Sequence, residues 1–334
     1  MMINSFKQFI KTNKRKFQFI AVLSVTIILV LLIILKVDWG EVKLNIIKIT
    51  WWQVALYFIV SIFSIAIAAY KWRFLAKYKS IDLPYKDFFK YYLTGSFINN
   101  VTPSIIGSDT YRVYAMGKKE KKYIESVSVV LMDRITGLAA LMIWAVFFSV
   151  LNYKEVADRP VLLMVNASLI LLFFVFFAVL KSQKFIFWQK LKKYLPNIVM
   201  KILREIKHFR SGGGVLPKSI FLGMAFNLVW VGLANYVIVR ALGINLGLLN
   251  YCSVIFLINI LSLVPISINN IGVKEWAYIA LFGCFGVPVT TAVTVAIISR
   301  FLMMLVSFLA LPVYFREKGS WAASPVEKNE APRS

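Results

Sequence analysis

Residues 99–112 read NNVTPSIIGSDTYR, a polar segment between two apolar runs, and residues 265–275 read PISINNIGVKE in a similar setting. Both segments contain residues that interrupt helices, because proline removes a backbone donor and glycine permits tight turns. These residues are Pro103 and Gly107 in the first segment and Pro265 and Gly272 in the second. A polar, helix-breaking sequence that recurs within an apolar chain predicts a duplicated membrane fold.

The two segments share the spacing between an acidic and a basic residue. Asp109 is followed twenty-five residues later by Arg134, and Glu275 is followed at the same distance by Arg300. Each arginine lies inside an apolar run, where a charge at the helix centre costs about 2.5–3.5 kcal/mol. The spacing therefore predicts two ion pairs, Asp109 with Arg134 and Glu275 with Arg300.

The composition is that of an integral membrane protein with several spans. The chain has 334 residues, of which 60% are hydrophobic and 16% are charged, whereas soluble domains are about half apolar and about a quarter charged. Its net charge is +24. No nucleic-acid motif accompanies this charge, so Lys and Arg in cytoplasmic loops explain it better. We expect a polytopic all-α bundle and no nucleic-acid partner.

Six apolar runs are long enough to cross the hydrocarbon core, which takes about 20 helical residues. They are 17–36, 51–70, 125–150, 161–180, 219–240 and 289–315. Basic residues before the first run place the N-terminus inside, and an even number of crossings returns the C-terminus to the same side. The sequence predicts a multi-pass protein of the cell (plasma) membrane with both termini cytoplasmic. On this scheme residues 37–50 are an outer loop and Lys71 begins a cytoplasmic loop.

The two polar segments interrupt stretches that are too short to cross, and we expect each to form a re-entrant hairpin. Lysines flank the first hairpin on both sides, which favours entry from the cytoplasm. Three crossings separate the hairpins, and this odd number inverts the second. The prediction is a single transmembrane domain, residues 1–315, with two inverted repeats at about 51–150 and 219–315 and a substrate site where they meet.

Two further segments are predicted to lie outside the bundle. Residues 181–218 hold ten Lys or Arg against one acid, with apolar residues at helical spacing. This pattern is typical of an amphipathic, basic cytoplasmic linker on the inner leaflet. Residues 316–334 are polar, and we expect them to be a disordered cytoplasmic tail.

The polar segments supply the candidate binding residues. Arg134 and Arg300 suit phosphate, because the planar guanidinium binds two oxygens at once. The acids expected to orient the arginines are Asp109, Asp133 and Glu275. The other candidate substrate-binding residues are Asn100, Thr102, Ser104, Arg112, Asn269, Asn270 and Lys274. Two alternatives stay open: the ion pairs only brace the hairpins, and the Ser, Thr and Asn side chains only cap helix ends.

No catalytic, metal or cofactor site is expected. The chain has no Ser/His/Asp set, no P-loop and no HExxH motif. Cys252 and Cys284 lie in apolar segments without metal-ligand spacing, and the single His208 lies in a basic stretch. Since there is no ATP site, any movement of a substrate would be passive or ion-coupled.

Both polar segments resemble signatures of the lysylphosphatidylglycerol synthase transmembrane-region family, also called flippase-like. The first signature covers NNVTPSIIGSDTYRVYAMGKK and SVVLMDRITGL, and the second covers VPISINNIGVKEWAYIALF and ISRFL. The resemblance extends over roughly residues 15–315. One departure is Gly107-Ser108-Asp109, where the family often has two glycines before the acid.

The resemblance implies a function in lipid transport. In larger members, such as the multiple peptide resistance factors linked to antibiotic resistance, this region moves aminoacylated phospholipid across the bilayer. A separate carboxy-terminal region of those proteins attaches lysine or alanine to phosphatidylglycerol. Nothing before Ser334 corresponds to that region, so we expect no lysyltransferase activity. Stand-alone members are associated with glycan and isoprenoid-lipid pathways.

The leading hypothesis is a flippase or scramblase for an anionic lipid, which would be a phospholipid, an aminoacyl-phospholipid or a polyprenyl-phosphate-linked glycan. One alternative is a lipid-modifying enzyme of the phosphatidylglycerol lysyltransferase type. Another is an accessory membrane subunit of a glycosyltransferase pathway. The expected partners are the anionic lipid and either a second copy of the chain or a lipid or glycan biosynthetic enzyme.

Overall fold

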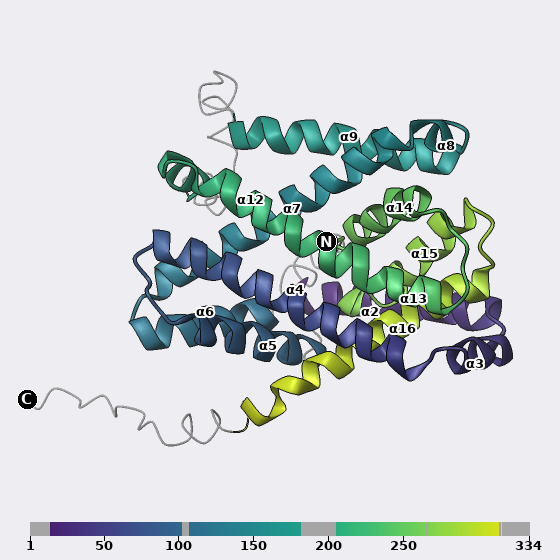
Figure 1. The fold of residues 1–334 in the computed structure, drawn as a ribbon, viewed down its shortest axis with the longest axis horizontal. Helices are drawn as coiled ribbons and strands as arrows, with labels where there is room; N and C mark the ends of the chain where they lie inside the picture. The colour runs from purple at the N-terminus through teal and green to yellow at the C-terminus, as the bar shows by residue number, and fades with distance from the viewer. Residues whose placement is uncertain (1–13, 102–106, 182–204, 265, 314, 316–334) are drawn as a thin grey trace, which may run out of the picture.

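The computed structural model describes residues 14–101, 107–181, 205–264, 266–313 and 315, and every regular element within them is helical. The first half contains α2 (Lys14–Lys36), α3 (Trp39–Ile47), α4 (Trp51–Tyr78), α5 (Tyr85–Val101), α6 (Gly107–Glu120), α7 (Tyr123–Leu151), α8 (Tyr153–Ala157) and α9 (Pro160–Lys181). The second half contains α12 (Val215–Asn227), η1 (Leu228–Ala234), α13 (Asn235–Ala241), α14 (Leu248–Leu261), η2 (Ile268–Asn270), α15 (Val273–Gly283), α16 (Val289–Ser307) and η3 (Phe308–Ala310). The all-α membrane architecture expected from the sequence is confirmed (Figure 1).

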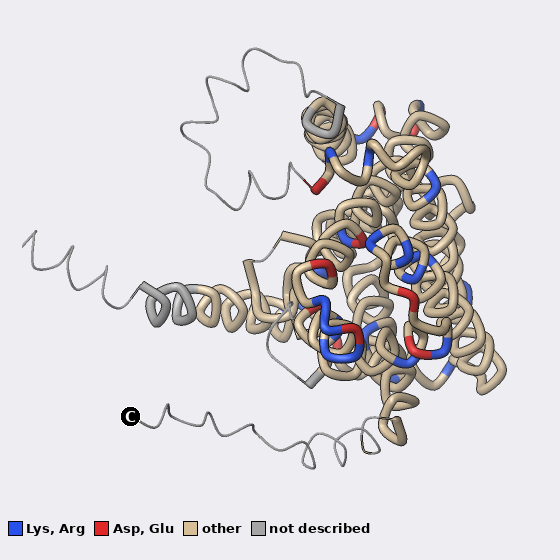
Figure 2. The backbone as a smooth tube through the Cα atoms, turned by 90° about the vertical axis from the view of Figure 1, so that its left-hand side faces the viewer, with Lys and Arg blue, Asp and Glu red and all other residues tan. Residues whose placement is uncertain are grey.

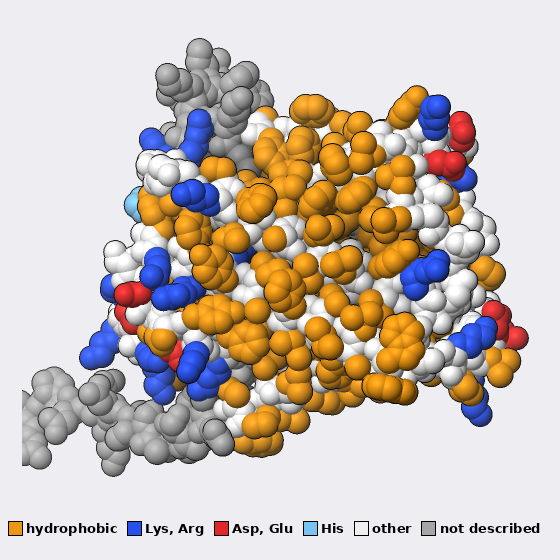
Figure 3. Space-filling model, viewed as in Figure 1, with side chains coloured by type: hydrophobic (Ala, Val, Ile, Leu, Met, Phe, Trp, Pro, Cys, Tyr) orange, Lys and Arg blue, Asp and Glu red, His pale blue; other side chains and the backbone are white. Residues whose placement is uncertain are grey.

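Five helices in the described residues are long and apolar enough to cross a membrane, namely α4, α7, α9, the continuous stretch Val215–Ala241 and the stretch Val289–Val313. A sixth is added if α2 and α3, which are bent by 81° to each other, are counted as one span. Each of the six predicted crossings overlaps one of these helices. Space-filling atoms show a broad apolar band between charged side chains at the two ends (Figure 3), as expected of a bundle whose middle faces hydrocarbon.

Residues 37–50, predicted as a loop, are mostly helical and form α3. Asp38 starts this helix, because its side chain accepts hydrogen bonds from the backbone N–H of Gly40 at 2.8 Å and of Glu41 at 3.2 Å. Val42 and Asn45 are buried, so α3 packs against the bundle. The mixed charge of the segment concealed this capped amphipathic helix.

Helix α4 is longer than the predicted crossing, and this places Lys71 inside it. The prediction that Lys71 begins a cytoplasmic loop is wrong, because the residue is only 3% exposed. The helix continues to Tyr78. A lysine tolerates such a place when an acid pairs with it, and the partner is described below.

Each polar break is flanked by two helices that pack against each other. Helices α5 and α6 flank the first break, and α14 and α15 flank the second. Figure 1 shows the first pair towards the left-hand end of the bundle and the second pair towards the right-hand end. The re-entrant path and the inverted relation of the two halves stay predictions.

The basic segment 181–218 lies mostly outside the described residues, and its last part packs on the bundle. Ile206 and Phe209 are buried, and Lys79 Nζ lies 5.2 Å from the Phe209 ring. Lys79 also pairs with Glu205 at 2.8 Å. Burial by itself would raise the pKa of Glu205, but hydrogen bonds from Lys79 and Ser128 lower that pKa below its ordinary value. The linker was expected to lie on the inner leaflet, but Ile206 and Phe209 pack against the helical bundle.

Several predicted features lie outside the described residues. They are the breakers Pro103 and Pro265, the candidate site residues Thr102 and Ser104, and the tail at 316–334.

Candidate functional site

A partly open cavity of about 510 Å³ is lined by helices from both halves of the chain. Its size is within the usual range for small-molecule sites, about 300–1,000 Å³. The polar and charged lining residues are Ser64, Lys71, Tyr92, Ser96, Asn99, Asn100, Ser108, Arg112, Asp133, Arg134, Asn227, Asn259 and Ser307. The remaining lining residues are Gly137 and apolar residues, namely Ile65, Ala68, Leu138, Leu141, Phe226, Trp230, Val231, Leu263, Met303 and Val306.

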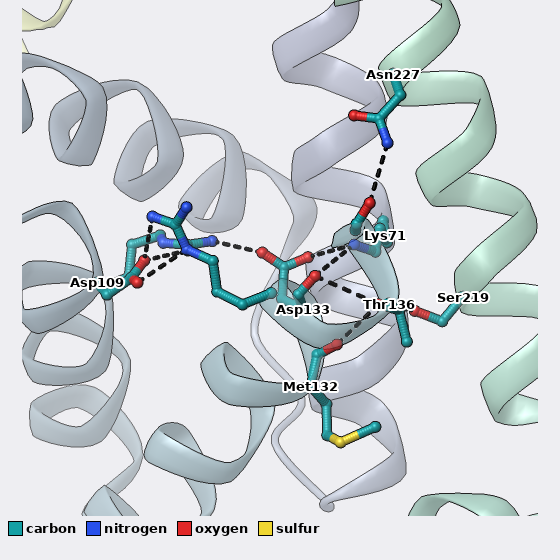
Figure 4. A network of polar contacts seen from close by, with 10 residues as sticks. Lys71, Asp109, Met132, Asp133, Thr136, Ser219 and Asn227 are labelled. Carbon is teal, nitrogen blue, oxygen red and sulfur yellow. Dashed lines mark hydrogen bonds and ion pairs between the residues drawn. The ribbon is translucent and has the colours of Figure 1, made fainter. Parts of the chain in front are cut away.

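Asp133 is at the centre of a buried charge network on the wall of this cavity (Figure 4). Lys71 Nζ lies 3.0 Å from Asp133 Oδ1 and also donates to the Asp133 backbone carbonyl at 2.7 Å. Arg112 Nη1 donates to Asp133 Oδ2 at 2.9 Å. All three side chains are less than a tenth exposed. Asp133 thus satisfies two buried cations from two other helices.

Asp109 connects this network to Arg134. Its Oδ1 accepts from Arg112 Nη2 at 2.6 Å and from Arg134 Nη2 at 3.0 Å, and its Oδ2 accepts from Arg134 Nε at 2.9 Å. The ion pair expected between Asp109 and Arg134 is therefore present. The side chain of Arg134 is 49% exposed, against 3% for Arg112. Arg134 is thus the cation of the network that is open to a ligand.

The spacing along α6 and α7 explains how four charged residues meet. Asp109 and Arg112 are three residues apart on α6, so they share one face of the helix. Asp133 and Arg134 are adjacent on α7, so their side chains leave the helix about 100° apart. One therefore reaches Lys71 on α4 and the other reaches Asp109 on α6.

Aromatic and backbone contacts fix this network in place. The Arg112 guanidinium carbon lies 5.1 Å from the Trp72 ring and 5.0 Å from the Tyr92 ring, a separation typical of cation–π contacts. Asn227 on α12 donates to the Gly137 carbonyl of α7 at 3.1 Å, and this bond is visible in Figure 4. Arg112 is therefore held by contacts on several sides. The bond from Asn227 joins α12 of the second half to α7 of the first half.

The second break contains a simpler arrangement around Arg300. Glu275 Oε1 accepts from Arg300 Nη2 at 3.0 Å, so the second expected ion pair is present as well. Arg300 also donates to the backbone carbonyls of Asn269 at 3.0 Å and Asn270 at 3.3 Å. Glu275 Oε2 accepts from the Gly272 N–H at 2.6 Å. The pair thus holds the irregular backbone of the break, and the two asparagines contact Arg300 through carbonyls.

The structure separates the candidate binding residues into two groups. Asn100, Arg112 and Arg134 line the cavity, whereas Asn269, Asn270, Lys274 and Arg300 do not. Asn100 donates to Ser307 Oγ of α16 at 2.8 Å, which closes one wall between the halves. Of the two arginines expected to bind phosphate, Arg134 therefore borders the cavity and Arg300 does not.

Sequence reasoning missed most residues of the cavity, and among them are Lys71, Asn227, Trp230 and Asn259. A signal for Lys71 was present, because Asp133 is a second acid beside Arg134 and has no partner at the repeated spacing. The other three lie in helices without any polar cluster, so only the fold brings them to the cavity.

Neutral side chains occupy the second site where charged ones occupy the first. Tyr278 follows Glu275 by three residues, as Arg112 follows Asp109. Ser299 directly precedes Arg300, as Asp133 directly precedes Arg134. Tyr278 and Ser299 are both buried. The Tyr278 hydroxyl donates to Asn235 Oδ1 at 3.2 Å. At these two positions the second site is thus neutral, and its further cation is Lys274, whose Nζ lies 6.0 Å from the Tyr278 ring.

The described residues contain no group of three or more His, Cys, Asp or Glu side chains that could hold a metal ion. Cys252 and Cys284 are free thiols. The carboxylates of the cavity are already paired with cations, so we assign no cofactor or metal ligand to them.

Comparison with known proteins gives the family. The lysylphosphatidylglycerol synthase transmembrane region matches residues 19–310. The chain belongs to this family. Two UPF0104 membrane proteins of Methanocaldococcus jannaschii are similar to it. One is 24% identical over 291 residues, 79% of this chain and 85% of the relative, and the other is 26% identical over 230 residues, 66% and 95% respectively.

Other members of the lysylphosphatidylglycerol synthase transmembrane-region family lie at similar distance. A UPF0104 membrane protein of Methanothermobacter thermautotrophicus is 22% identical over 267 residues, 73% of this chain and 78% of the relative. No solved structure matches the chain. The family agrees with the resemblance inferred from the two polar segments, and with a multi-pass membrane protein.

Proposed function

We propose that the protein moves an anionic lipid between the leaflets of the cell membrane, with the lipid head group held in the cavity. The carrying observation is the charge of the cavity network. Three cations, Lys71, Arg112 and Arg134, face two carboxylates, Asp109 and Asp133. One positive charge is left over, and the exposed Arg134 is where an anion would neutralise it.

The arrangement of Arg134 supports phosphate as the group that it binds. A guanidinium offers donors in a planar fork that fits two phosphate oxygens. Asp109 holds Arg134 by two hydrogen bonds along one edge, which reduces the entropy lost on binding. The apolar part of the cavity wall suits the first carbons of a lipid chain, while the rest of the chain would stay in the bilayer.

Loop charges support a cytoplasmic location for the left-hand end of the bundle in Figure 1. Figure 2 looks onto this end and shows Lys and Arg among fewer Asp and Glu. The cations in the loops and helix ends there are Lys77, Lys79, Lys86, Lys118, Lys119, Lys121 and Lys122. An excess of Lys and Arg in short loops marks the cytoplasmic side. On this orientation the yellow end of α16 is cytoplasmic (Figure 1), and a cytoplasmic N-terminus stays a prediction.

The test is transport by the full chain in phosphatidylcholine vesicles that contain a trace of fluorescent phosphatidylglycerol. We expect the label to exchange between leaflets faster than in protein-free vesicles. Arg134→Gln should lower the rate by about tenfold or more, because a hydrogen bond between charged groups is worth about 1.5–3 kcal/mol.

A matched control is Arg159→Gln, which also breaks an arginine–carboxylate pair, here with Glu155, but lies outside the cavity. Its transport rate should stay close to that of the wild type. No exchange above the protein-free rate, with correctly folded protein in the vesicles, would refute the proposal. Equal exchange rates for the two variants would show that Arg134 has no part in lipid transport.

A further inference from the structure

The polar lining of the cavity distinguishes between head groups, and this inference rests on the proposed function. We infer that the lipid carries one phosphate bearing a neutral, hydroxyl-rich group, such as glycerol or a sugar, and that a cationic aminoacyl head group is excluded. The charges, the amides and the free acceptors of the cavity each support part of this statement.

The first argument is that the cavity offers no free carboxylate to a cation. Asp133 is engaged by Lys71 and Arg112, and Asp109 is engaged by Arg112 and Arg134. The other lining residues described by the structure are neutral. A lysyl or alanyl ammonium beside Arg134 would therefore meet an excess of positive charge, and like charges placed together are strongly unfavourable.

The second argument is that one exposed guanidinium matches one phosphate. Lys71 and Arg112 have side chains only 4% and 3% exposed, against 49% for Arg134. Moving either buried cation to a ligand would break one of the two buried ion pairs of Asp133, and the loss of one partner of a buried pair is costly. A head group with a single phosphate fits this one available arginine.

The third argument is that neutral donors and acceptors make up the remaining polar wall. Four asparagines line the cavity, namely Asn99, Asn100, Asn227 and Asn259, together with four serines. Asn99 Oδ1 is buried without a hydrogen-bond partner in the described part of the chain. A buried acceptor without a partner is unfavourable unless a donor reaches it. A hydroxyl supplies such a donor, and amides suit hydroxyl groups because they both donate and accept.

The experiment compares three lipids that differ only beyond the phosphate. Phosphatidylglycerol has a neutral diol, phosphatidylethanol has no hydroxyl, and lysyl-phosphatidylglycerol adds a cation. Two readouts are measured for each lipid: the rise in melting temperature of the full chain in detergent, which reports recognition, and exchange between leaflets in phosphatidylcholine vesicles, which reports transport. We expect phosphatidylglycerol to bind about three- to tenfold more tightly than phosphatidylethanol, the range of one net hydrogen bond. It should bind at least about tenfold more tightly than the lysyl lipid.

A designed acid in the cavity tests the charge argument directly. Asn259→Asp places a carboxylate at a lining position, and the wild-type side chain makes only a hydrogen bond to the Ile255 carbonyl of its own helix at 2.9 Å. We expect this variant to bind the lysyl lipid and phosphatidylglycerol with equal affinity. The control is Asn166→Asp, since Asn166 makes the same type of bond to Leu162 at 2.8 Å but lies outside the cavity. This variant should keep the wild-type preference.

The outcomes separate the two proposals. Equal or tighter binding of the lysyl lipid by the wild type would overturn the exclusion of cationic head groups, and equal binding of phosphatidylethanol would overturn recognition of hydroxyls. The expected order of melting temperatures without any exchange between leaflets would support the head-group inference and refute transport. Exchange of all three lipids at equal rates would support transport and refute the inference.

Discussion

Arg112 and Arg134 share one carboxylate, yet their surroundings give them different chemical roles. Both donate to Asp109, but Arg112 is enclosed by aromatic rings and a second acid. Its charge is therefore used to hold α6 against α7. Arg134 keeps about half of its side chain exposed at the cavity. A single acid thus orients one arginine for structure and another for a ligand.

The buried pair of Lys71 and Asp133 should show strong energetic coupling. Lys71→Met alone removes one cation from Asp133, and Asp133→Asn alone takes from the buried Lys71 its acid and leaves Arg112 with Asp109 only. We expect each single variant to lower the free energy of unfolding by about 3 kcal/mol, as is usual when one partner of a buried pair is lost. The double variant should lose less than the sum, by about 1–3 kcal/mol.

The measurement is chemical denaturation of the purified protein in detergent, with all four proteins of the cycle compared in one buffer. Lys43→Met serves as the control for loss of a lysine, because no ion pair to Lys43 is found in the described residues. Strict additivity of the two single variants would contradict the coupling and remove the energetic argument for the network.

At the scale of elements, the second break depends on close contact with the first helix. Gly272 has φ +87°, and a Cβ atom there would lie 2.5 Å from Leu29 Cβ of α2. Gly272→Ala should therefore destabilise the protein by about 1–3 kcal/mol, since it combines a left-handed backbone with a clash. The same substitution at Gly283, also in this region, meets no atom within 4 Å.

Thermal unfolding in detergent of the two alanine variants tests this contact. We expect a clear fall in melting temperature for Gly272→Ala and little change for Gly283→Ala. A Gly272→Ala protein as stable as the wild type would show that α2 is not held against the break in solution.

The stability that the end of the basic linker adds to the fold should depend on pH through Glu205. Its pKa is lowered in the folded protein by Lys79 and Ser128 against the opposing effect of burial. The carboxylate therefore contributes stability above its ordinary pKa, and this contribution is lost as the pH falls towards the lower, folded value. Because Glu205 is partly exposed, the contribution is under about 1 kcal/mol.

Glu205→Gln should consequently unfold more easily than the wild type at pH 7, and the difference should shrink progressively as the pH falls below the ordinary glutamate pKa. Denaturation curves of both proteins over a series of pH values from neutral to acid provide the measurement. A difference that persists unchanged in acid would mean that the glutamine affects packing, with no role for the charge.

The elements could be predicted from the sequence wherever one property decides them. Breakers fix the ends of α6 at Gly107 and of α15 at Gly272, and the paired spacing predicts both arginine–acid contacts. Other features depend on tertiary contacts. The local sequence of Lys71 suggests a loop, and only its contact with Asp133 explains its burial in a helix. Asn259 lies in an apolar helix, and only the tertiary fold shows that it lines the cavity.

At the scale of the whole molecule, the unequal charge of the two halves bears on how they would function together. Both halves have an acid–arginine pair at a break between packed helices. Within the described residues, only the first pair borders the cavity, and only the first is joined by ion pairs to further charged side chains. If the halves are inverted repeats, they have diverged so that one borders the cavity of the proposed ligand and the other holds a fixed backbone.

The inverted relation itself can be tested by labelling single cysteines from one side of the membrane. The background is Cys252→Ala with Cys284→Ala, which removes both native thiols. The three substitutions are Lys118→Cys near the end of α6, Gly247→Cys directly before α14 and Lys154→Cys in α8, and all three positions are exposed.

An impermeant maleimide added to whole cells should label positions 247 and 154 but not 118. Position 118 should react only after the cells are permeabilised, because its loop is rich in lysine and is expected inside. Position 154 fixes the outer face independently of either break. Labelling of 118 and 247 from the same side would therefore place both helix pairs on one face, and the halves would then be related by a parallel repeat.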